Sequence, residues 1–291
     1  MRTLCFLLMM LWAHRAGAAI SVRDGSGATV TVERPAQRVA TLAPHATELV
    51  FAAGAGARIV AAGDYSDYPP AAAAIPRVGS NRLIDTERLV ALRPDLLVVW
   101  LGGNAERQLE PLRRLGVPVY QSAPKSLDDI AGEIERLGRL TGTSATAQPA
   151  ADALRARLAA LAPRYRDKPQ VRVFYQVWEQ PLYTLNGRQI VSDAIRLCGG
   201  VNVFADLPAL APTVSIEAVL QANPEVIIRG ARPGEQAPGL AMWKPYPALL
   251  AAQRGNLYTV DADLMARAGP RMVDGAEALC ARLDEARAKG R

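Results

Sequence analysis

The sequence predicts an α/β protein made of two similar lobes, each with a mostly parallel central sheet, joined by one long helix. The main observation is an internal repeat: residues 84–100 read IDTERLVALRPDLLVVW and residues 214–230 read VSIEAVLQANPEVIIRG. In each copy a glutamate (Glu87, Glu217) opens a short amphipathic helix, a proline ends it, and an acid precedes a buried apolar strand. A helix that leads into a buried apolar strand is typical of a parallel sheet.

A second pair of segments supports the duplication. Residues 47–56 (TELVFAAGAG) and 192–204 (SDAIRLCGGVNVF) each start with a residue suited to cap a helix, continue as an apolar-faced helix and end at glycines suited to a left-handed C-cap. Each half also opens with a β-rich run, at residues 38–42 and 171–177. Two α/β lobes are the simplest interpretation.

The segment between the repeats, residues 143–161, is rich in alanine, and its leucines at 154, 158 and 161 have helical spacing. About 18 helical residues span about 27 Å, which is enough to connect two lobes. A surface helix within one lobe is the alternative. The expected organisation is a signal segment at residues 1–19, an N-terminal lobe at 20–142, a linker helix at 143–167 and a C-terminal lobe at 168–291.

Residues 1–19 have the pattern of a secretory signal peptide. Arg2 supplies the positive start, residues 4–12 form a short apolar run, and Ala16-Gly17-Ala18 is a small-residue cleavage signal. A buried N-terminal helix is the alternative. The apolar run is too short for a bilayer crossing, which requires about 20 residues. We therefore expect the chain to be exported.

The composition limits the classes of binding partner to be expected. The 291 residues are 50% hydrophobic, which is typical of an ordered globular chain. Removing residues 1–18 takes away Arg2 and Arg15 and lowers the formal charge from +6 to +4, with 32 basic and 28 acidic side chains left. The sequence has no Lys/Arg-rich run and no basic-aromatic alternation. Nucleic acid is therefore not an expected partner.

Catalysis is not expected either. After export the chain retains one histidine, His45, which does not suffice for an HExxH zinc helix or a histidine-cluster metal site. No phosphate-binding loop of the GxxxxGK[ST] type is present. A secreted metal-dependent hydrolase is the alternative class, which metal analysis would identify. A small-molecule site between two lobes is the better expectation.

Cysteine usage points to a disulfide. Cys5 leaves with the signal segment, while Cys198 and Cys280 remain in an oxidising compartment. A bond between them would stabilise the fold by a few kcal/mol in the chain-entropy account. Two free buried thiols are the alternative.

Several segments carry a family resemblance: RVATLAPHATELVFAAGAG, GDYSDYPPAA, DTERLVALRPDLLVVWLGGNAERQ, LCGGVNVF, TVSIEAVL and ARAGPRMVDGAEALCARL. They resemble the periplasmic cobalamin-binding proteins of bacterial ABC importers, within the helical-backbone class that binds cobalamin, haem and iron siderophores. DYSDYPP and GGNAERQ are specific for the cobalamin branch, and the match runs over residues 38–283.

This resemblance implies a periplasmic, monomeric, non-enzymatic protein without a cofactor of its own. Such a protein holds cobalamin or a related corrinoid between its lobes and delivers it to ABC transporter permease subunits. A haem or iron-siderophore binding protein of the same class is the alternative. For haem, His45 or Tyr65 is the candidate axial ligand.

The resemblance also implies site residues. Tyr65 and Trp100 in the N-terminal lobe and Tyr183 in the C-terminal lobe match aromatic positions that line the ligand site, and Asp263 with Arg267 matches a polar pair at the ligand's periphery. Flat rings suit the apolar faces of a corrin, and its amide rim needs hydrogen-bonding partners. The alternatives are core packing for the aromatic residues and an exposed helical ion pair for the other two.

Three positions depart from the family pattern. Asn81 and Ala211 stand where better-known members have tryptophan, and His45 stands where they have a small residue. Two missing rings imply weaker stacking or a differently shaped ligand, and Trp178 is a candidate to compensate. His45 has two interpretations: a loop histidine bonded to the backbone, or an imidazole that contacts the corrin rim or coordinates a metal centre.

Glu87 and Glu217 lie at the same point of each repeat. A carboxylate in the first turn interacts favourably with the helix dipole whatever else it does. In the resembling family such glutamates dock against arginines of the two permease subunits. We therefore expect this pair to be the permease-docking residues.

Overall fold

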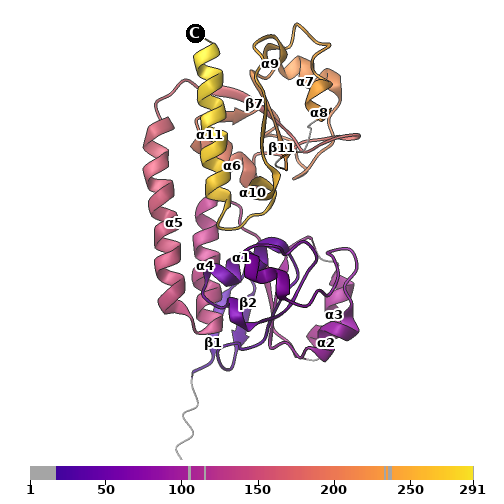
Figure 1. The fold of residues 1–291 in the computed structure, drawn as a ribbon, viewed down its shortest axis with the longest axis vertical. Coiled ribbons are helices and arrows are strands. Elements are labelled where there is room, and N and C mark those ends of the chain that lie inside the picture. The colour runs from indigo at the N-terminus through magenta and orange to yellow at the C-terminus, as the bar shows by residue number, and fades with distance from the viewer. Residues whose placement is uncertain (1–17, 104–105, 115, 233, 235–237, 291) are drawn as a thin grey trace, which may run out of the picture.

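The fold is taken from a computed structural model that describes residues 18–103, 106–114, 116–232, 234 and 238–290. Two α/β lobes lie one above the other along the long axis of the molecule (Figure 1). Residues 1–17 of the expected signal segment lie outside the described residues. Among the residues described, no helix combines the length and hydropathy that a bilayer crossing requires.

Each lobe contains a four-stranded parallel sheet. The N-terminal sheet has the order β4-β3-β5-β6 and the C-terminal sheet the order β10-β7-β11-β12. When the strands of each sheet are numbered in chain order, both orders are 2-1-3-4. The predicted two-lobed α/β fold is confirmed, and the duplication extends to strand order. The strand bounds are β3 Val39–Thr41, β4 Ile59–Ala62, β5 Leu96–Trp100, β6 Val119–Ser122, β7 Val171–Gln176, β10 Gly200–Asn202, β11 Val226–Ala231 and β12 Leu257–Asp261.

The sequence repeat folds as predicted. Helix α2 (Thr86–Ala91) leads into β5, and helix α7 (Ile216–Ala222) leads into β11. The side chains of Asp85 and Ser215 cap these helices by accepting hydrogen bonds from the backbone N–H groups three residues on, at 2.9 and 3.2 Å. Such caps satisfy N–H groups that the helix itself leaves without a partner.

Each repeat is tied to its sheet by the same pair of contacts. In the N-terminal lobe Asp95 accepts hydrogen bonds from the backbone N–H groups of Gln37 (2.9 Å) and Arg38 (2.8 Å), and the Arg38 guanidinium donates to the carbonyl that follows α2 (2.6 Å). In the C-terminal lobe Glu225 accepts from the N–H of Arg172 (3.1 Å), whose guanidinium donates to the last carbonyl of α7 (2.6 Å). The exposed helix of each lobe is thus anchored at its carboxyl end.

The helices predicted to start at Thr47 and Ser192 both begin earlier in the structure. Helix α1 spans Pro44–Ala52 and α6 spans Ile190–Leu197, so Thr47 and Ser192 lie inside the helices that they were expected to cap. Proline in the first turn of α1 explains the earlier start, because its φ is preset for a helix and its missing N–H is not needed there.

The left-handed glycines at the ends of these two helices are confirmed. Gly54 has a φ of 82° and Gly199 a φ of 69°. A Cβ atom at Gly54 would also lie 2.7 Å from the side chain of Thr146. Glycine is therefore required at Gly54 both by the backbone conformation and by the close approach of the neighbouring helix.

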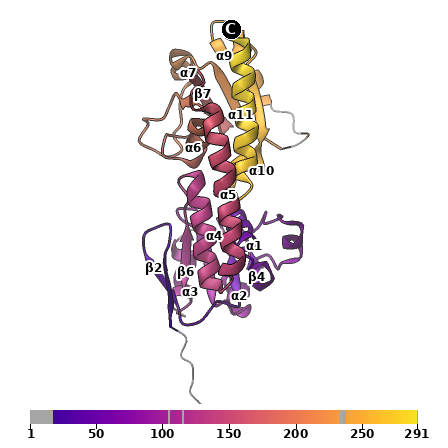
Figure 2. The ribbon, with the colours of Figure 1, turned by 90° about the vertical axis from the view of Figure 1, so that its left-hand side faces the viewer.

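The long helix expected between the repeats is α5 (Ser144–Tyr165), whose 22 residues extend about 33 Å. It lies beside α4 (Leu127–Thr141) and contacts α11 (Met272–Lys289), as Figure 2 shows. The lobes are therefore connected along a group of packed helices and not by one isolated helix. The lobe boundaries at residues 142 and 168 stay a prediction.

One hydrophobic cluster runs through both lobes. It includes Leu49 and Leu137 in the N-terminal lobe and Ile195 and Leu279 in the C-terminal lobe, all fully buried. Interiors packed in this way resist deformation. The remaining elements are β1 Ile20–Arg23, β2 Thr29–Val32, α3 Glu106–Arg114, β8 Trp178–Glu179, β9 Leu182–Tyr183, α8 Pro238–Ala241, α9 Leu250–Gln253, α10 Ala262–Ala266 and the short 3₁₀ turns Gly56–Arg58 and Pro70–Ala74.

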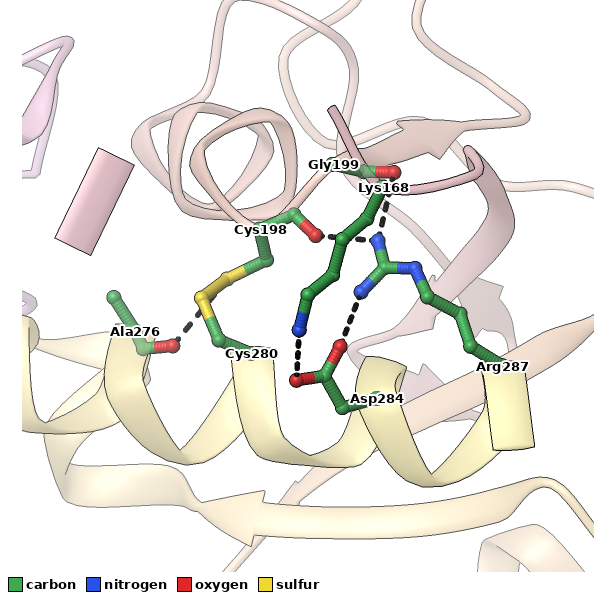
Figure 3. The surroundings of a disulfide bond; sticks show 7 residues. All are labelled: Lys168, Cys198, Gly199, Ala276, Cys280, Asp284 and Arg287. Carbon is green, nitrogen blue, oxygen red and sulfur yellow. Dashed lines mark hydrogen bonds and ion pairs between the residues drawn. A yellow bond between two sulfur atoms is a disulfide. The ribbon is translucent and has the colours of Figure 1, made fainter. Parts of the chain in front are cut away.

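The predicted disulfide between Cys198 and Cys280 is present and joins the end of α6 to α11 (Figure 3). The alternative of two free thiols is therefore wrong. Arg287 donates to the carbonyl of Cys198 at 2.7 Å and pairs with Asp284 at 2.7 Å, and Lys168 pairs with the same carboxylate at 2.6 Å. These contacts hold the chain around the disulfide.

Candidate functional site

Segments that follow the carboxyl ends of strands meet where the two lobes face each other. The N-terminal lobe contributes Glu48, in the helix after β3, and Asp67, after β4. The C-terminal lobe contributes Arg267 and Arg271, which follow β12. Ion pairs between these residues place the carboxyl edges of the two sheets opposite each other. Parallel-sheet proteins bind ligands at such edges.

The ion pairs form an inter-lobe charge cluster of Glu48, Asp67, Asp263, Arg267 and Arg271. Glu48 is 3% exposed and accepts two bonds from Arg271, at 3.0 and 2.6 Å, and one from Arg267 at 3.4 Å. Arg267 is 8% exposed and also donates to Asp67 at 2.5 Å and to Asp263 at 3.2 Å. Each buried charge in the cluster therefore has at least one opposite charge beside it.

Hydrogen bonds within the cluster favour the charged forms of Asp67 and Arg271. The hydrogen bond from Arg267 lowers the pKa of Asp67, and the bond to Glu48 raises the pKa of Arg271. The guanidinium of Arg271 also lies over the ring of Tyr68, 3.8 Å from its centroid. Breaking a buried pair by removing one partner is strongly destabilising, because the remaining charge has lost its water. The cluster therefore holds the facing edges together.

The pair predicted at the ligand's periphery lies inside this cluster. The alternative of an exposed helical ion pair is wrong, because Arg267 is buried and α10 ends one residue before it. Asp263 is partly exposed and also lies 4.0 Å from Arg232. Ligand contact by Asp263 and Arg267 stays a prediction.

Trp100 and His45 lie together at the carboxyl edge of the N-terminal sheet. Trp100 ends β5 and is 46% exposed, and the His45 ring meets it edge-on, with the ring centroids 6.2 Å apart. His45 lies in the first turn of α1 and not in a loop, and its Nε2 has no hydrogen-bond partner among the described residues. Burial lowers the pKa of His45 to about 4. The imidazole is therefore neutral at neutral pH, the form that can coordinate a metal.

Tyr65 and Asn81 are exposed residues of two neighbouring segments of the N-terminal lobe. Tyr65 is 70% exposed and has a φ of 64°, which is uncommon for an aromatic residue. The backbone N–H of Asp64 donates to the carbonyl of Gly79 at 2.8 Å, which joins the two segments. Backbone strain of this kind collects at functional sites. This conformation is consistent with a ligand-binding role for Tyr65.

Tyr183 and Ala211 come from neighbouring segments of the C-terminal lobe. Tyr183 lies in β9 directly opposite Trp178 of β8, and on its other side it bridges to Thr213. Ala211 is exposed and lies two residues before Thr213. Glu179 of β8 pairs with the buried Arg229 of β11 at 3.3 Å. This pair ties the aromatic hairpin to the carboxyl end of the sheet.

The two docking candidates lie elsewhere. Glu87 and Glu217 are exposed in the first turns of α2 and α7, one in each lobe. Hydrogen bonds from its own backbone N–H and from Ser215 lower the pKa of Glu217. The structure thus separates these glutamates from the residues at the facing edges.

Sequence reasoning missed three members of the charge cluster: Glu48, Asp67 and Arg271. A usable signal existed for Glu48, because it is the one charge in the apolar run of residues 47–56. A carboxylate on an otherwise apolar helix needs a partner if that helix is buried. The partner Arg271 is 223 residues away, so no local pattern identifies it.

Neither the potential metal ligands nor the surface hollows of the described residues indicate a further binding site. No group of three or more potential metal ligands occurs in the part of the chain that the structure describes. A hollow of about 500 Å³ lies beside α6 and β10, lined in part by Arg166, Lys168 and Arg196, and none of the predicted site residues lines it. Lys168 and Arg196 already pair with carboxylates. We assign no ligand to it.

Known proteins share both sequence and fold with this chain. Residues 39–264 match the family described as periplasmic binding protein. A protein of Vibrio cholerae named vitamin B12-binding protein is 41% identical over 248 residues, which cover 84% of this chain and 88% of that protein. The crystal structure of the periplasmic vitamin B12 binding protein BtuF of Vibrio cholerae aligns with a TM-score of 0.80 at 40% identity, over 87% of this chain and 98% of that one.

A more distant structure shares the same architecture. The crystal structure of a periplasmic heme binding protein from Pseudomonas aeruginosa aligns with a TM-score of 0.73 at 26% identity, over 84% of this chain and 92% of that one. The structural likeness and the family match agree with the resemblance seen in the sequence motifs. The chain belongs to the periplasmic binding protein family.

Proposed function

We propose that this chain is a periplasmic substrate-binding protein that captures cobalamin or a related corrinoid and delivers it to an ABC transporter permease. The observation that carries the proposal is the 41% identity to a vitamin B12-binding protein over 88% of that protein's length. The corrinoid is a transported ligand in this proposal, so the chain needs no cofactor and performs no catalysis.

The aromatic and polar side chains at the facing edges support the proposal that the ligand is flat. Trp100 stands at the carboxyl edge of one sheet and Tyr183 on the hairpin at the edge of the other. A corrin has broad apolar faces that suit aromatic rings and an amide rim that suits polar side chains. Asp263 and the exposed Asn81 are such polar groups.

The proposed ligand contacts therefore come from both lobes. Arg267 links the lobes through Asp67 and also donates a separate hydrogen bond to Asp263, which orients that carboxylate. The proposed ligand-binding residues are His45, Tyr65, Asn81, Trp100, Tyr183, Ala211, Asp263 and Arg267.

Titration of the mature protein tests this function. Calorimetry with cyanocobalamin, cobinamide and haemin in parallel should show saturable binding of one corrinoid per chain and no saturation with haemin. Saturation with haemin alone would favour the haem-binding alternative, for which the neutral His45 imidazole is the candidate axial ligand. Absence of binding to all three compounds would overturn the proposal.

Glu87 and Glu217 are proposed to dock on the permease. Both are exposed, and Arg38 and Arg172 anchor the helices that carry them, so their separation is held by the sheets. Joint substitution of Glu87→Arg and Glu217→Arg should abolish transport in reconstituted vesicles and leave corrinoid affinity unchanged. The exposed Glu33→Arg is the matched control and should transport normally. Lost affinity in the double variant would contradict the assignment.

Export is proposed to remove the signal segment at residues 1–19. The mass of the protein recovered from the periplasm should correspond to a chain that starts near residue 19 or 20. Its elution in size-exclusion chromatography should correspond to a monomer. Recovery of the full-length chain from the cytoplasm would contradict this part of the proposal.

A further inference from the structure

Two exposed apolar residues lie close in sequence to Glu87, one of the two proposed docking residues. Five large hydrophobic side chains are exposed in the described part of the N-terminal lobe: Tyr65, Tyr68, Leu83, Val90 and Trp100. Two of the aromatic ones are proposed ligand residues, and the third lies against Arg271 of the other lobe. The two aliphatic ones have no such role. Exposed apolar side chains that lie near each other and among polar residues mark interaction sites.

Leu83 and Val90 lie on either side of Glu87 along the chain. Val90 follows Glu87 by three positions in α2, so the two side chains share the exposed face of the helix, with Cβ atoms about 5 to 6 Å apart. Leu83 precedes Glu87 by four positions, a stretch that spans at most about 14 Å. The footprint of a standard protein interface is wider, at about 800 Å² on each partner. Leu83, Glu87 and Val90 therefore form one surface, the N-terminal docking surface.

The turn that carries Leu83 is fixed by its own hydrogen bonds. Gly79 and Ile84 form an antiparallel bridge across it, and the backbone N–H of Ser80 donates to the carbonyl of Leu83 at 2.9 Å. The hydroxyl of Ser80 accepts from the backbone N–H of Arg82 at 3.2 Å. A Cβ atom at Gly79, whose φ is 95°, would collide with the carbonyl of Leu83. Leu83 is 75% exposed on this compact turn.

The side-chain amide of Gln108 ties the same turn to the neighbouring helix. Its Oε1 accepts a hydrogen bond from the backbone N–H of Ile84 at 2.8 Å, and its Nε2 donates to the carbonyl of Arg82 at 2.7 Å. Gln108 belongs to α3, which contacts α2 (Figure 1). A side chain on a fixed turn costs less conformational entropy to bind than one on a mobile loop. The N-terminal lobe thus presents Leu83 in a position suited to contact a partner.

The equivalent positions around Glu217 present no such side chains. The sequence repeat aligns Leu83 with Thr213 and Val90 with Leu220. Thr213 is exposed but polar, and Leu220 is partly buried against the hydrophobic core of its lobe. No large hydrophobic residue exposed in the described part of this lobe lies within six positions of Glu217. The two docking glutamates therefore have different surroundings, apolar in one lobe and polar in the other.

From this difference we propose that the N-terminal lobe is the stronger of the two anchors on the permease. Leu83 and Val90 pack against an apolar surface of one permease subunit, beside the cation that pairs with Glu87. The inference rests on the proposed docking of Glu87 and Glu217 and adds the side chains that make the two sites unequal. Apolar contacts around a charge pair exclude water and lessen its screening by salt. The pair made by Glu217 stays accessible to water and salt.

A protein that offers a cation fits this surface better than a lipid surface or a second copy of the chain does. Glu87 lies between the two apolar residues, and moving its carboxylate into hydrocarbon without a partner would be costly. Asp85, which is also exposed, adds a second negative charge beside it. Two copies related by a two-fold axis would bring the same carboxylates together. The expected partner surface is therefore apolar and contains an arginine or a lysine.

Binding of the corrinoid-loaded mature protein to vesicles that contain the corrinoid importer of the same organism tests the apolar contacts. Leu83→Ala should weaken this binding by about tenfold, and Val90→Ala by about threefold. Val201→Ala is the matched control for Val90→Ala, because both valines are 38% exposed and Val201 lies in β10, outside the docking surface. The control should bind within about twofold of the unaltered protein.

The salt dependence of the same binding separates the two glutamates. At about 0.1 M salt both Glu87→Ala and Glu217→Ala should weaken binding, and raising the salt to about 1 M shortens the screening length from about 10 Å to about 3 Å. At the higher concentration Glu217→Ala should bind within about twofold of the unaltered protein, because a screened exposed pair contributes little. Glu87→Ala should still bind about tenfold more weakly.

Four results would overturn the unequal anchors. Equal losses for the two glutamates at both salt concentrations, or unchanged binding of Leu83→Ala and Val90→Ala, would do so while docking by the glutamates stands. Binding to vesicles without the importer would assign the apolar residues to lipid, and a dimer that Leu83→Ala converts to a monomer would assign them to a second copy. Failure of the unaltered protein to bind the importer would overturn the docking proposal as well, whereas calorimetry with corrinoids tests ligand capture separately.

Discussion

The two lobes share a scaffold and differ in the charges that they present to each other. Both sheets have the strand order 2-1-3-4, and both anchor an exposed helix through an arginine at its carboxyl end. At the facing edges, however, the N-terminal lobe contributes Glu48 and Asp67, and the C-terminal lobe contributes Arg267 and Arg271. The duplicated parts position the strand ends, and the residues outside the repeat make the two edges complementary.

The disulfide is a further asymmetry between the lobes and should have the largest effect. Joint substitution of Cys198→Ala and Cys280→Ala should lower the free energy of unfolding by about 4 to 5 kcal/mol, because the unfolded chain loses a constraint on a loop of 82 residues. Urea unfolding of the oxidised protein and of the variant measures the difference. Chemical reduction of the unaltered protein should give the same loss. A difference below about 1 kcal/mol would show that the constraint contributes little.

The charge complementarity predicts the next effect. Glu48→Gln should cost about 3 to 5 kcal/mol in unfolding free energy, because the half-buried Arg271 would lose the carboxylate that it pairs with and the buried Arg267 would lose one of its three. Thermal or urea unfolding provides the measurement. The control is Glu285→Gln, which removes an exposed pair with Arg282 and should cost less than about 1 kcal/mol. Equal costs for the two variants would mean that the lobes do not depend on this cluster.

His45 gives the N-terminal lobe a pH dependence that should be smaller. Its pKa is about 4 in the folded state, against 6.5 for a free histidine, so the unfolded chain binds a proton first as the pH falls. Stability should therefore decrease between pH 7 and pH 4, by about 3 kcal/mol in total, since each unit corresponds to about 1.4 kcal/mol.

Two measurements check this prediction. NMR titration of the protein prepared without residues 1–19, which then has one imidazole, should show a midpoint near pH 4. Urea unfolding of His45→Asn across the same range should lack this part of the pH dependence. An imidazole that titrates near pH 6.5 would contradict the burial of its ring.

The smallest predicted effect is that of the helix caps, and it tests directly whether the two lobes gain the same stability from equivalent contacts. Asp85→Ala and Ser215→Ala each remove the cap of the exposed helix in one lobe and should each cost about 1 kcal/mol. Differential scanning calorimetry of the two variants gives the comparison. Similar losses of unfolding free energy would show that the two caps contribute equally to stability. A marked difference would show that the lobes share their geometry but not the energy of this contact.

The sequence predicted the features whose causes are local. The helix, proline, acid and strand of residues 84–100 and 214–230 are recognisable because each element has its own pattern, and the Cys198–Cys280 pairing followed from the removal of Cys5. The predicted starts of α1 and α6 were wrong because Thr47 and Ser192 are residue types that often cap helices. In the structure both lie inside their helices and are buried.

Features that depend on distant contacts could not be predicted. Glu48 meets Arg271 from 223 residues away, and the register that sets Trp178 opposite Tyr183 depends on how two strands of two residues each pair. Burial of His45 in α1 also depends on the approach of Trp100 from the end of β5. In each case the chemical type of the residue was visible in the sequence, and its neighbour was not.

The apolar cluster that passes from Leu49 to Ile195 and Leu279 bears on how the two halves are inherited. A gene fragment that encodes a single lobe would yield a chain with part of this cluster turned toward water, which invites aggregation. The halves are therefore no longer independent modules, although they keep the same internal plan. Melting should occur as one cooperative event, and recombination between related genes should succeed only when it exchanges both halves together.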